Sequence, residues 1–340
     1  DRAVFEQFST SNHNLGPADL DVLPRFAGPH TFARLPRLDQ VSRYDVAVVG
    51  VPFDAGTSYR PGARFGPQAI RMGSKLLREY HPHLNAEPFS AQQVVDAGDI
   101  GCDPFNIHEA MAAIERGADA LLDNGAKLVT LGGDHTIAVP LLRAMNRVHG
   151  PVALVHFDAH LDTWETHFNA RFTHGTPFRR AAEEGLFVAD HSMHVGIRGS
   201  VYDRGDYGAD ADLGFGIIGT WETDDIGVRG VVERLRERIA GYPVYLSIDI
   251  DVLDPAFAPG TGTPEIGGFS TRELAAILRG LQGMPIVGLD VVEVAPAYDH
   301  AEVTALAAAN IAYDVIAMMA PRSDGSAENP RTAVAAETFT

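Results

Sequence analysis

Apolar residues along the chain fall either in short continuous runs or at spacings of three and four residues. The short runs are typical of buried strands, and the three-and-four spacing is typical of helices with one apolar face. The predicted strands cover residues 44–50, 93–97, 128–131, 152–157, 192–197, 215–218, 243–246 and 286–292. The predicted helices cover residues 106–123, 139–149, 177–184, 228–240, 270–281 and 304–319, and a further one begins at Pro67.

This alternation of strands and helices predicts an α/β fold, a three-layer α-β-α arrangement around a central, mostly parallel sheet. Residues 1–43 are polar and rich in Pro, Gly and Asn, which indicates an N-terminal arm. We expect one catalytic domain over residues 44–320 and a C-terminal tail over 321–340. Residues 201–213 are acidic and rich in Gly, so we expect a loop there. Ser270 followed by Glu273 predicts a capping box at the start of a helix.

The composition narrows the classes of partner. The net charge is −18, from 45 acidic and 27 basic residues, which argues against nucleic acid and anionic membranes as partners. Cys102 is the single cysteine, so an intramolecular disulfide and a cysteine-rich zinc site are excluded. No apolar run is long enough to span a membrane, and no secretory leader is visible. We therefore expect a cytoplasmic protein.

The stretch that follows the strand at 152–157 carries Asp158, His160 and Asp162 at alternate positions. In an extended segment, residues at i, i+2 and i+4 point to the same side, so these three side chains should converge. Carboxylates brought this close resist joint ionisation unless a positive charge lies among them. A bound metal ion is the simplest source of that charge.

Two other stretches place similar side chains just past predicted strands. His135 follows the strand at 128–131, and Asp249 and Asp251 follow the run at 244–246. Ligands of open α/β sheets bind at the carboxyl ends of the strands, so the three stretches should meet. The oxygen-rich set suits two hard divalent ions such as Mn²⁺; the alternative is a hydrogen-bonded network without metal. The candidate ligands are His135, Asp158, His160, Asp162, Asp249 and Asp251.

The amino-acid sequences of these stretches resemble the metal-binding signatures of the ureohydrolase family, which includes arginase and agmatinase. They are Gly-Gly-Asp-His at 132–135, Asp-Ala-His-Leu-Asp at 158–162 and Ser-Ile-Asp-Ile-Asp-Val-Leu-Asp-Pro at 247–255. The resemblance covers residues 44 to about 319 and extends to the stretches 60–67, 174–178, 255–265 and 291–299. The last two resemble the agmatinase and guanidinobutyrase branch. The resemblance implies the same three-layer fold and a homo-oligomer, a trimer or hexamer.

The resemblance also implies roles for individual residues. Asp158 and Asp249 would bridge two Mn²⁺ ions, one completed by His135 and Asp162 and the other by His160 and Asp251. Glu293, past a strand end, would grip a guanidinium with both carboxylate oxygens. His174 would be the proton shuttle, since an imidazole titrates near neutral pH. The alternatives are a structural salt bridge for Glu293 and a loop-ordering role for His174.

Four residues near the motifs stay outside this ligand set. Asp134 is interpreted as a partner that orients a ligand, and Asp254, before a proline, as a turn residue. The role of His156 is open. His194 lies outside the motifs and is interpreted as a surface or packing residue.

The resemblance implies hydrolysis of a linear guanidino compound to an amine and urea, with agmatine as first choice. The alternatives are 4-guanidinobutyrate and a proclavaminate-type guanidino acid. Trp164, Arg171 and Arg198 are candidate substrate contacts in the loops that cover the site. Acidic loop residues would favour agmatine, and basic ones an acid: Glu165, Asp203 and Asp206 against Arg171, Arg198 and Arg204. A non-catalytic family member and a zinc-dependent amide hydrolase are alternatives from other classes.

Overall fold

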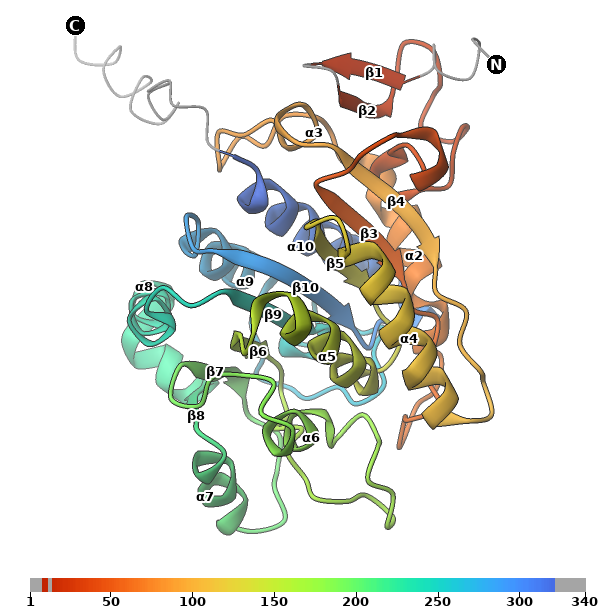
Figure 1. Cartoon of the computed structure of the whole chain (residues 1–340). Coiled ribbons are helices and arrows are strands. Elements are labelled where there is room, and N and C mark those ends of the chain that lie inside the picture. Colours follow the sequence, from red (N-terminus) through yellow and green to blue (C-terminus); the bar gives the residue numbers. More distant parts are fainter. Residues whose placement is uncertain (1–7, 12–13, 322–340) are drawn as a thin grey trace, which may run out of the picture.

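A parallel sheet of eight strands forms the centre of the computed structural model, which describes residues 8–11 and 14–321 (Figure 1). The strand order is β4-β3-β5-β10-β9-β6-β7-β8, and each neighbouring pair is parallel. The strands are β3 (Val46–Gly50), β4 (Val94–Asp99), β5 (Lys127–Leu131), β6 (Ala153–Phe157), β7 (Ser192–Ile197), β8 (Phe215–Gly219), β9 (Val244–Asp249) and β10 (Ile286–Val292).

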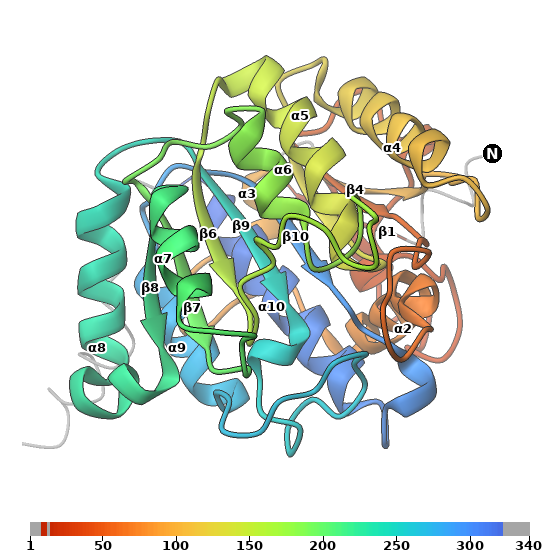
Figure 2. The same ribbon diagram turned by 90° about the horizontal axis from the view of Figure 1, so that it is seen from below.

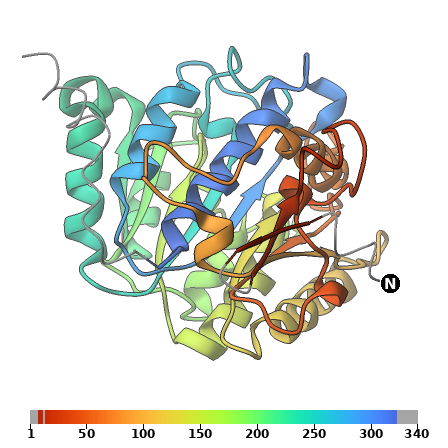
Figure 3. The same cartoon turned by 90° about the horizontal axis from the view of Figure 1, so that it is seen from above.

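Helices cover both faces of this sheet, as Figure 3 shows from above, with the yellow and green helices opposite the blue ones. One layer consists of α4 (Ile107–Leu122), α5 (Ala138–His149) and α6 (Pro177–Glu183). The other consists of α2 (Gly66–Gly73), α3 (Pro88–Ala91), α8 (Thr220–Ile239), α9 (Thr271–Gly280) and α10 (Val303–Met319). The predicted three-layer α-β-α fold is therefore confirmed.

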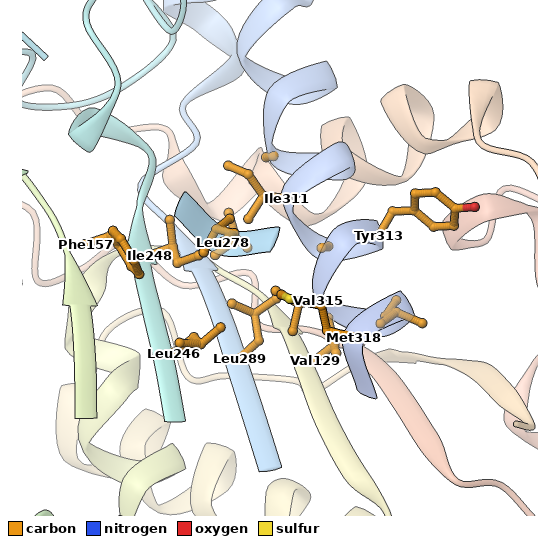
Figure 4. Close-up of a cluster of buried hydrophobic side chains, with 14 of the residues drawn as sticks. Val129, Phe157, Leu246, Ile248, Leu278, Leu289, Ile311, Tyr313, Val315 and Met318 are labelled. Carbon is orange, nitrogen blue, oxygen red and sulfur yellow. The ribbon is translucent and has the colours of Figure 1, made fainter. Parts of the chain in front are cut away.

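The sheet is apolar on both faces because each face is covered by helices. In β3, Val46 and Val48 belong to the core beneath α10, while Ala47 and Val49 belong to the core beneath α4 and α5. Figure 4 shows the first of these cores, where strand residues lie against the helices α9 and α10. The labelled contributors are Val129, Phe157, Leu246, Ile248, Leu278, Leu289, Ile311, Tyr313, Val315 and Met318.

The predicted strands and most of the predicted helices are found within a few residues of their expected bounds. Ser270 and Glu273 form the predicted capping box at the start of α9. Residues 201–213 differ from the prediction, because a helix, α7 (Gly205–Asp212), lies in the expected loop. The helix α8 begins at Thr220, eight residues earlier than expected, and Gly227 interrupts it with φ of 63°.

The N-terminal region contains a two-stranded antiparallel sheet, β1 (Phe8–Ser11) with β2 (Asn14–Ala18). Phe32, Ala33 and Leu35 are fully buried in the core of the main sheet. The domain boundary at residue 44 stays a prediction, and the expected tail lies outside the described residues beyond Pro321. No helix in the described ranges has both the length and the apolar stretch needed to cross a membrane.

Candidate metal centre

Four adjacent strands, β5, β10, β9 and β6, end beside one another and carry the predicted site residues. Figure 2 shows β6, β9 and β10 side by side and running in the same direction. One acidic or imidazole side chain stands at or just after the end of each strand: His135, Glu293, Asp249 and Asp158, in the order of the sheet. The expectation that these stretches meet at the carboxyl edge of the sheet is confirmed.

The stretch from Asp158 to Asp162 converges through a bend and not through the extended conformation that its alternation predicts. His160 donates its backbone N–H to Asp158 Oδ1 at 2.6 Å, and Ala159 donates its own to Asp251 Oδ1 at 3.1 Å. The carboxylates satisfy N–H groups that the strand ladder no longer pairs. Asp162 and Glu293 have left-handed backbones, with φ of 55° and 63°. Such strain in non-glycine residues concentrates at functional sites.

His135 Nδ1 is a buried nitrogen with no hydrogen-bond partner among the described residues. It faces carboxylate oxygens of Asp162 at 3.0 Å, Asp158 at 3.3 Å and Asp249 at 3.5 Å. The other ring nitrogen, Nε2, lies 2.8 Å from Ser247 Oγ, which fixes the ring orientation. An unpartnered imidazole nitrogen aimed at several carboxylates fits a metal ligand.

A second group lies on the other side of Asp158 and consists of Asp158, His160 and Asp251. His160 Nδ1 is 3.3 Å from Asp158 Oδ1 and 3.2 Å from Asp251 Oδ2. The first group consists of His135, His156, Asp158 and Asp162, and in each group the possible ligand atoms lie within 4.8 Å of one another. Asp158 belongs to both groups, so the donor set fits two cations that share one carboxylate.

His156, whose role the sequence leaves open, is close enough to His135, Asp158 and Asp162 to count as a possible ligand. Both of its ring nitrogens already have partners, because Nε2 lies 2.7 Å from Asp158 Oδ2 and Nδ1 lies 2.6 Å from His194 Nδ1. Burial lowers the pKa of His156 to about 3, so the ring is neutral. His156 is therefore a hydrogen-bond partner of Asp158.

Burial and mutual repulsion shape the charges of these carboxylates. Burial alone would raise the pKa of Asp158, but the imidazoles of His156 and His135 hold it well below its ordinary value. Burial and the neighbouring carboxylates raise the pKa of Asp249 well above its ordinary value, and that of Asp251 to about 6. The cluster without a cation therefore retains protons that a metal would displace.

Glu293 and His174 form a pair beside the first group. His174 Nδ1 lies 3.1 Å from Glu293 Oε1, which also accepts the backbone N–H of His135 at 2.9 Å. Glu293 Oε2 is buried and has no hydrogen-bond partner in the described part of the chain. Burial opposes protonation of His174, but the carboxylate of Glu293 raises its pKa to about 9. On the opposite side of the ring, Ser58 Oγ lies 2.6 Å from His174 Nε2.

The predicted substrate contacts lie in different environments. Trp164 packs against Tyr202, with ring centroids 5.3 Å apart, and its buried indole N–H has no partner within the described residues. Trp164 also lines a small cavity with His160, which places it beside the second group. Arg171 pairs with Glu183 at 2.8 Å on the surface. The roles predicted for Trp164 and Arg171 stay predictions, and only the position of Trp164 favours contact with substrate.

Arg198 is held by backbone carbonyl groups from three segments of the chain. Its guanidinium donates to Asp251 and Glu265 carbonyl oxygens, each at 2.7 Å, and to Ile266 at 3.0 Å. These bonds tie the loop after β9 to the loop that contains Glu265, so they favour a structural role. The substrate role of Arg198 stays a prediction.

The sequence motifs assigned no role in the site to three residues that the structure places there: Ser58, His156 and His194. Ser58 comes from the loop after β3, on the opposite side of β5 from β10, and only the strand order brings it to His174. His156 and His194 stand opposite each other on the paired strands β6 and β7, and sequence alone does not identify those strands as neighbours. Asp254 shapes a turn, as expected, by accepting the backbone N–H of Ala256. Asp134, expected to orient a ligand, instead accepts the backbone N–H groups of Gly56 and Thr136.

Comparison with known proteins agrees with this geometry. A sequence model of the Arginase family matches residues 44–318. The chain is 43% identical to the guanidinobutyrase of Pseudomonas aeruginosa over 300 residues, covering 87% of this chain and 94% of that protein. It is 41% identical to the mitochondrial agmatinase of Gallus gallus over 303 residues, covering 89% of each. The solved structure of proclavaminate amidino hydrolase from Streptomyces clavuligerus matches with a TM-score of 0.84 and 43% identity, covering 88% of this chain and 99% of that chain.

Proposed function

Because the chain belongs to the arginase family, a family of metal-dependent hydrolases, we propose that it hydrolyses a linear guanidino compound to an amine and urea. One observation carries the proposal. Glu293 Oε2 and His135 Nδ1 are buried without a hydrogen-bond partner among the described residues, and they stand at the ends of β10 and β5, which are neighbours in the sheet. The first suits a cationic guanidinium, and the second suits a metal ion.

We propose that two Mn²⁺ ions bind at the shared carboxylate of Asp158. The donor set of carboxylate oxygens and imidazole nitrogens without thiolate supports a hard divalent ion. A bound metal pair supplies an activated water at neutral pH. The residues that would hold one ion are His135, Asp158, Asp162 and Asp249, and those for the other are Asp158, His160, Asp249 and Asp251.

Glu293 would bind and orient the guanidinium. Its Oε1 is held by the backbone N–H of His135, so the carboxylate keeps its direction when substrate arrives. Its Oε2 is free to accept a guanidinium N–H, and a charge-assisted bond of this kind gives both affinity and orientation. Holding the flat cation in one place beside the metal ligands reduces the entropy lost on the way to the transition state.

His174 would deliver the proton that the leaving amine needs. With a pKa raised to about 9 beside Glu293, the ring carries a proton at neutral pH. Glu293 Oε1 holds Nδ1, and Ser58 Oγ is 2.6 Å from Nε2, so both nitrogens are fixed. Because Ser58 also donates its backbone N–H to Nε2 at 3.1 Å, we infer that the proton leaves from Nδ1, on the side of Glu293, with Ser58 holding the ring in position.

Agmatine is the substrate that the rim of the site supports best. Of the three arginines that would favour an acid, Arg198 is occupied by backbone carbonyl groups and Arg171 by Glu183, which leaves Arg204 as the remaining cation for a substrate carboxylate. Glu265 places a carboxylate oxygen 3.6 Å from His160 Nε2 at the rim, where it could meet the ammonium of agmatine. A guanidino acid is the second candidate, because the guanidinobutyrase of Pseudomonas aeruginosa is 43% identical to this chain.

The test is urea release by Mn²⁺-loaded protein with agmatine, 4-guanidinobutyrate, 3-guanidinopropionate and arginine measured side by side. Preference for agmatine supports the proposal in full. Preference for a guanidino acid keeps the reaction and replaces the substrate. No urea from any of the four, with two metals bound, would overturn the proposal and favour either a non-catalytic protein or an amide hydrolase.

We also propose a homo-oligomer, a trimer or hexamer, and a cytoplasmic location. The oligomer rests on the ureohydrolase resemblance, and light scattering coupled to gel filtration would measure its mass. The location rests on the sequence pattern, and imaging a tagged copy in the native cell would test it.

A further inference from the structure

A chain of buried polar side chains leads away from the proposed metal ligands toward the edge of the sheet. The paired strands β6 and β7 place His156 opposite His194, with their Nδ1 atoms 2.6 Å apart. Both rings are fully buried. Phe178 packs against His156 and Phe215 against His194, with centroid distances of 4.2 Å and 3.9 Å. Two imidazoles between aromatic rings would be costly if their nitrogens lacked partners.

The chain continues to α7, the helix that the sequence did not predict. Asp210, fully buried in α7, places Oδ1 3.2 Å from His194 Nε2, which is an ion-pair distance without hydrogen-bond geometry. The same oxygen accepts the hydroxyl of Thr163 at 2.8 Å. Thr163 directly follows the proposed ligand Asp162. This series of side-chain contacts therefore begins at one proposed metal ligand, Asp158, and ends beside another, Asp162.

Only one order of donors satisfies the contacts between Asp158, His156 and His194. An ionised carboxylate can only accept, so His156 must donate from Nε2 to Asp158. The Nδ1 atom of the neutral ring is then a lone pair and must accept from His194 Nδ1. The orientation of Asp158 therefore depends on His194, and the other nitrogen of His194, Nε2, faces the carboxylate of Asp210 at 3.2 Å.

We propose that His156, His194 and Asp210 are positioning residues that hold Asp158 and the Asp162–Thr163 segment at the separation required by two metal ions. The proposal rests on the metal-dependent function argued above. It assigns to α7 a part in the metal centre, although no residue of α7 belongs to the proposed ligand set. Hydrogen-bond partners of metal ligands commonly change metal affinity by about 10–100-fold when they are removed.

The experiment compares variants that break the chain with variants that preserve it. His194→Leu removes the bonds of the imidazole with little change of volume, and Asp210→Leu removes the carboxylate but introduces a larger side chain. We expect Mn²⁺ binding weakened about 10–100-fold in both. His194→Gln keeps an amide that can donate to His156, and Asp210→Asn keeps an amide oxygen that can accept the hydroxyl of Thr163 and face His194. We expect these two variants to stay within about threefold of the wild-type affinity, a small fraction of the partner effect. Affinity is measured by chelator competition, and the geometry of the bound pair by the electron paramagnetic resonance spectrum of Mn²⁺.

The matched control is His81→Leu, because His81 is also a buried imidazole paired with a buried aspartate, Asp314. We expect it to lower the thermal midpoint while leaving Mn²⁺ affinity and spectrum unchanged. If His194→Leu and Asp210→Leu behave in the same way as this control, these side chains contribute only to packing and the proposal is wrong.

A leucine variant that does not fold leaves the decision to Thr163→Val, which removes only the hydroxyl that Asp210 accepts. Weakened Mn²⁺ affinity in this variant supports the proposal, and unchanged affinity overturns it. Failure of the proposed function is distinguishable, because wild-type protein would then bind fewer than two metals or release no urea.

Discussion

Two buried clusters of histidine and carboxylate in the described part of the chain differ in whether their polar atoms have partners. In the cluster near α10, His81 Nε2 lies 2.5 Å from Asp314 Oδ1, and His81 Nδ1 accepts the backbone N–H of Leu84 at 3.2 Å. Arg279 donates to the other oxygen of Asp314 at 2.9 Å. Every polar side-chain atom of His81 and Asp314 is paired, so this cluster is complete as it stands.

The cluster at the carboxyl edge of the sheet is incomplete, because some of its buried polar atoms are not paired within the described ranges. Its six proposed ligands are four carboxylates and two imidazoles, and His135 Nδ1 and Glu293 Oε2 are buried without a hydrogen-bond partner among the described residues. Buried polar groups are nearly always paired in folded proteins, so each exception requires an explanation. Between these two clusters, the difference lies in the unpartnered atoms and not in buried charge as such.

The largest expected effect comes from removing the carboxylate that both metal groups share. Asp158→Asn should lose bound Mn²⁺ and reduce kcat/KM by at least about 10³-fold, because metal catalysis supplies several kcal/mol of charge stabilisation. Metal content by elemental analysis and urea release measure the two effects. The matched control is Asp254→Asn. Asp254 also lies in one of the three stretches that resemble metal-binding signatures, but its side chain accepts backbone N–H groups of Ala256, Gly267 and Gly268. Full metal content in Asp158→Asn would contradict the ligand assignment.

The second effect separates proton transfer from metal binding. His174→Asn should reduce kcat by about 10²–10⁴-fold, the usual contribution of a positioned acid. Metal content should not change, because His174 contacts Glu293 and Ser58 and none of the proposed ligands. A variant that raised KM alone would show that His174 only helps to bind substrate.

The third effect concerns the complete cluster. Asp314→Leu leaves His81 and Arg279 without their carboxylate and should destabilise the protein by about 3 kcal/mol, the lower end for breaking a buried pair, because Arg279 is partly exposed. Urea denaturation measures this change, and Mn²⁺ affinity should stay at the wild-type value. Loss of metal binding in this variant would mean that the two clusters are not independent.

Much of the proposed site could be predicted from the sequence because it lies at strand ends. Strand positions follow from apolar runs, and the ligands of one metal stretch are adjacent in sequence, as in residues 158–162. The box formed by Ser270 and Glu273 is likewise local and was predicted correctly. Such features depend on neighbours along the chain.

The remainder depends on which strands and helices become neighbours in space. The contact between His156 and His194 requires β6 beside β7, and that of Ser58 with His174 requires loops from two different strands. The helix α7 is composed largely of Gly and Asp, which are poor helix formers, so local propensity favours a loop. Its Asp210 accepts from Thr163, a tertiary contact that local sequence does not reveal.

The smallest expected effect is a pH dependence that distinguishes the pair formed by His174 and Glu293 from an ordinary surface histidine. Burial would lower the pKa of His174, but Glu293 raises it to about 9, above the ordinary value of about 6.5. A pKa raised on folding stabilises the folded state below the unfolded pKa, and this stabilisation disappears as the pH rises to about 9.

Metal-free wild-type protein should therefore lose stability relative to metal-free His174→Asn between about pH 6.5 and pH 9, by no more than a few kcal/mol. Denaturation of both proteins at matched pH values isolates this term, because other titrating groups are common to the two. A difference that grows in the opposite direction would mean that His174 is neutral in the folded protein. It would then accept a proton during the reaction, and the leaving amine would require a different donor.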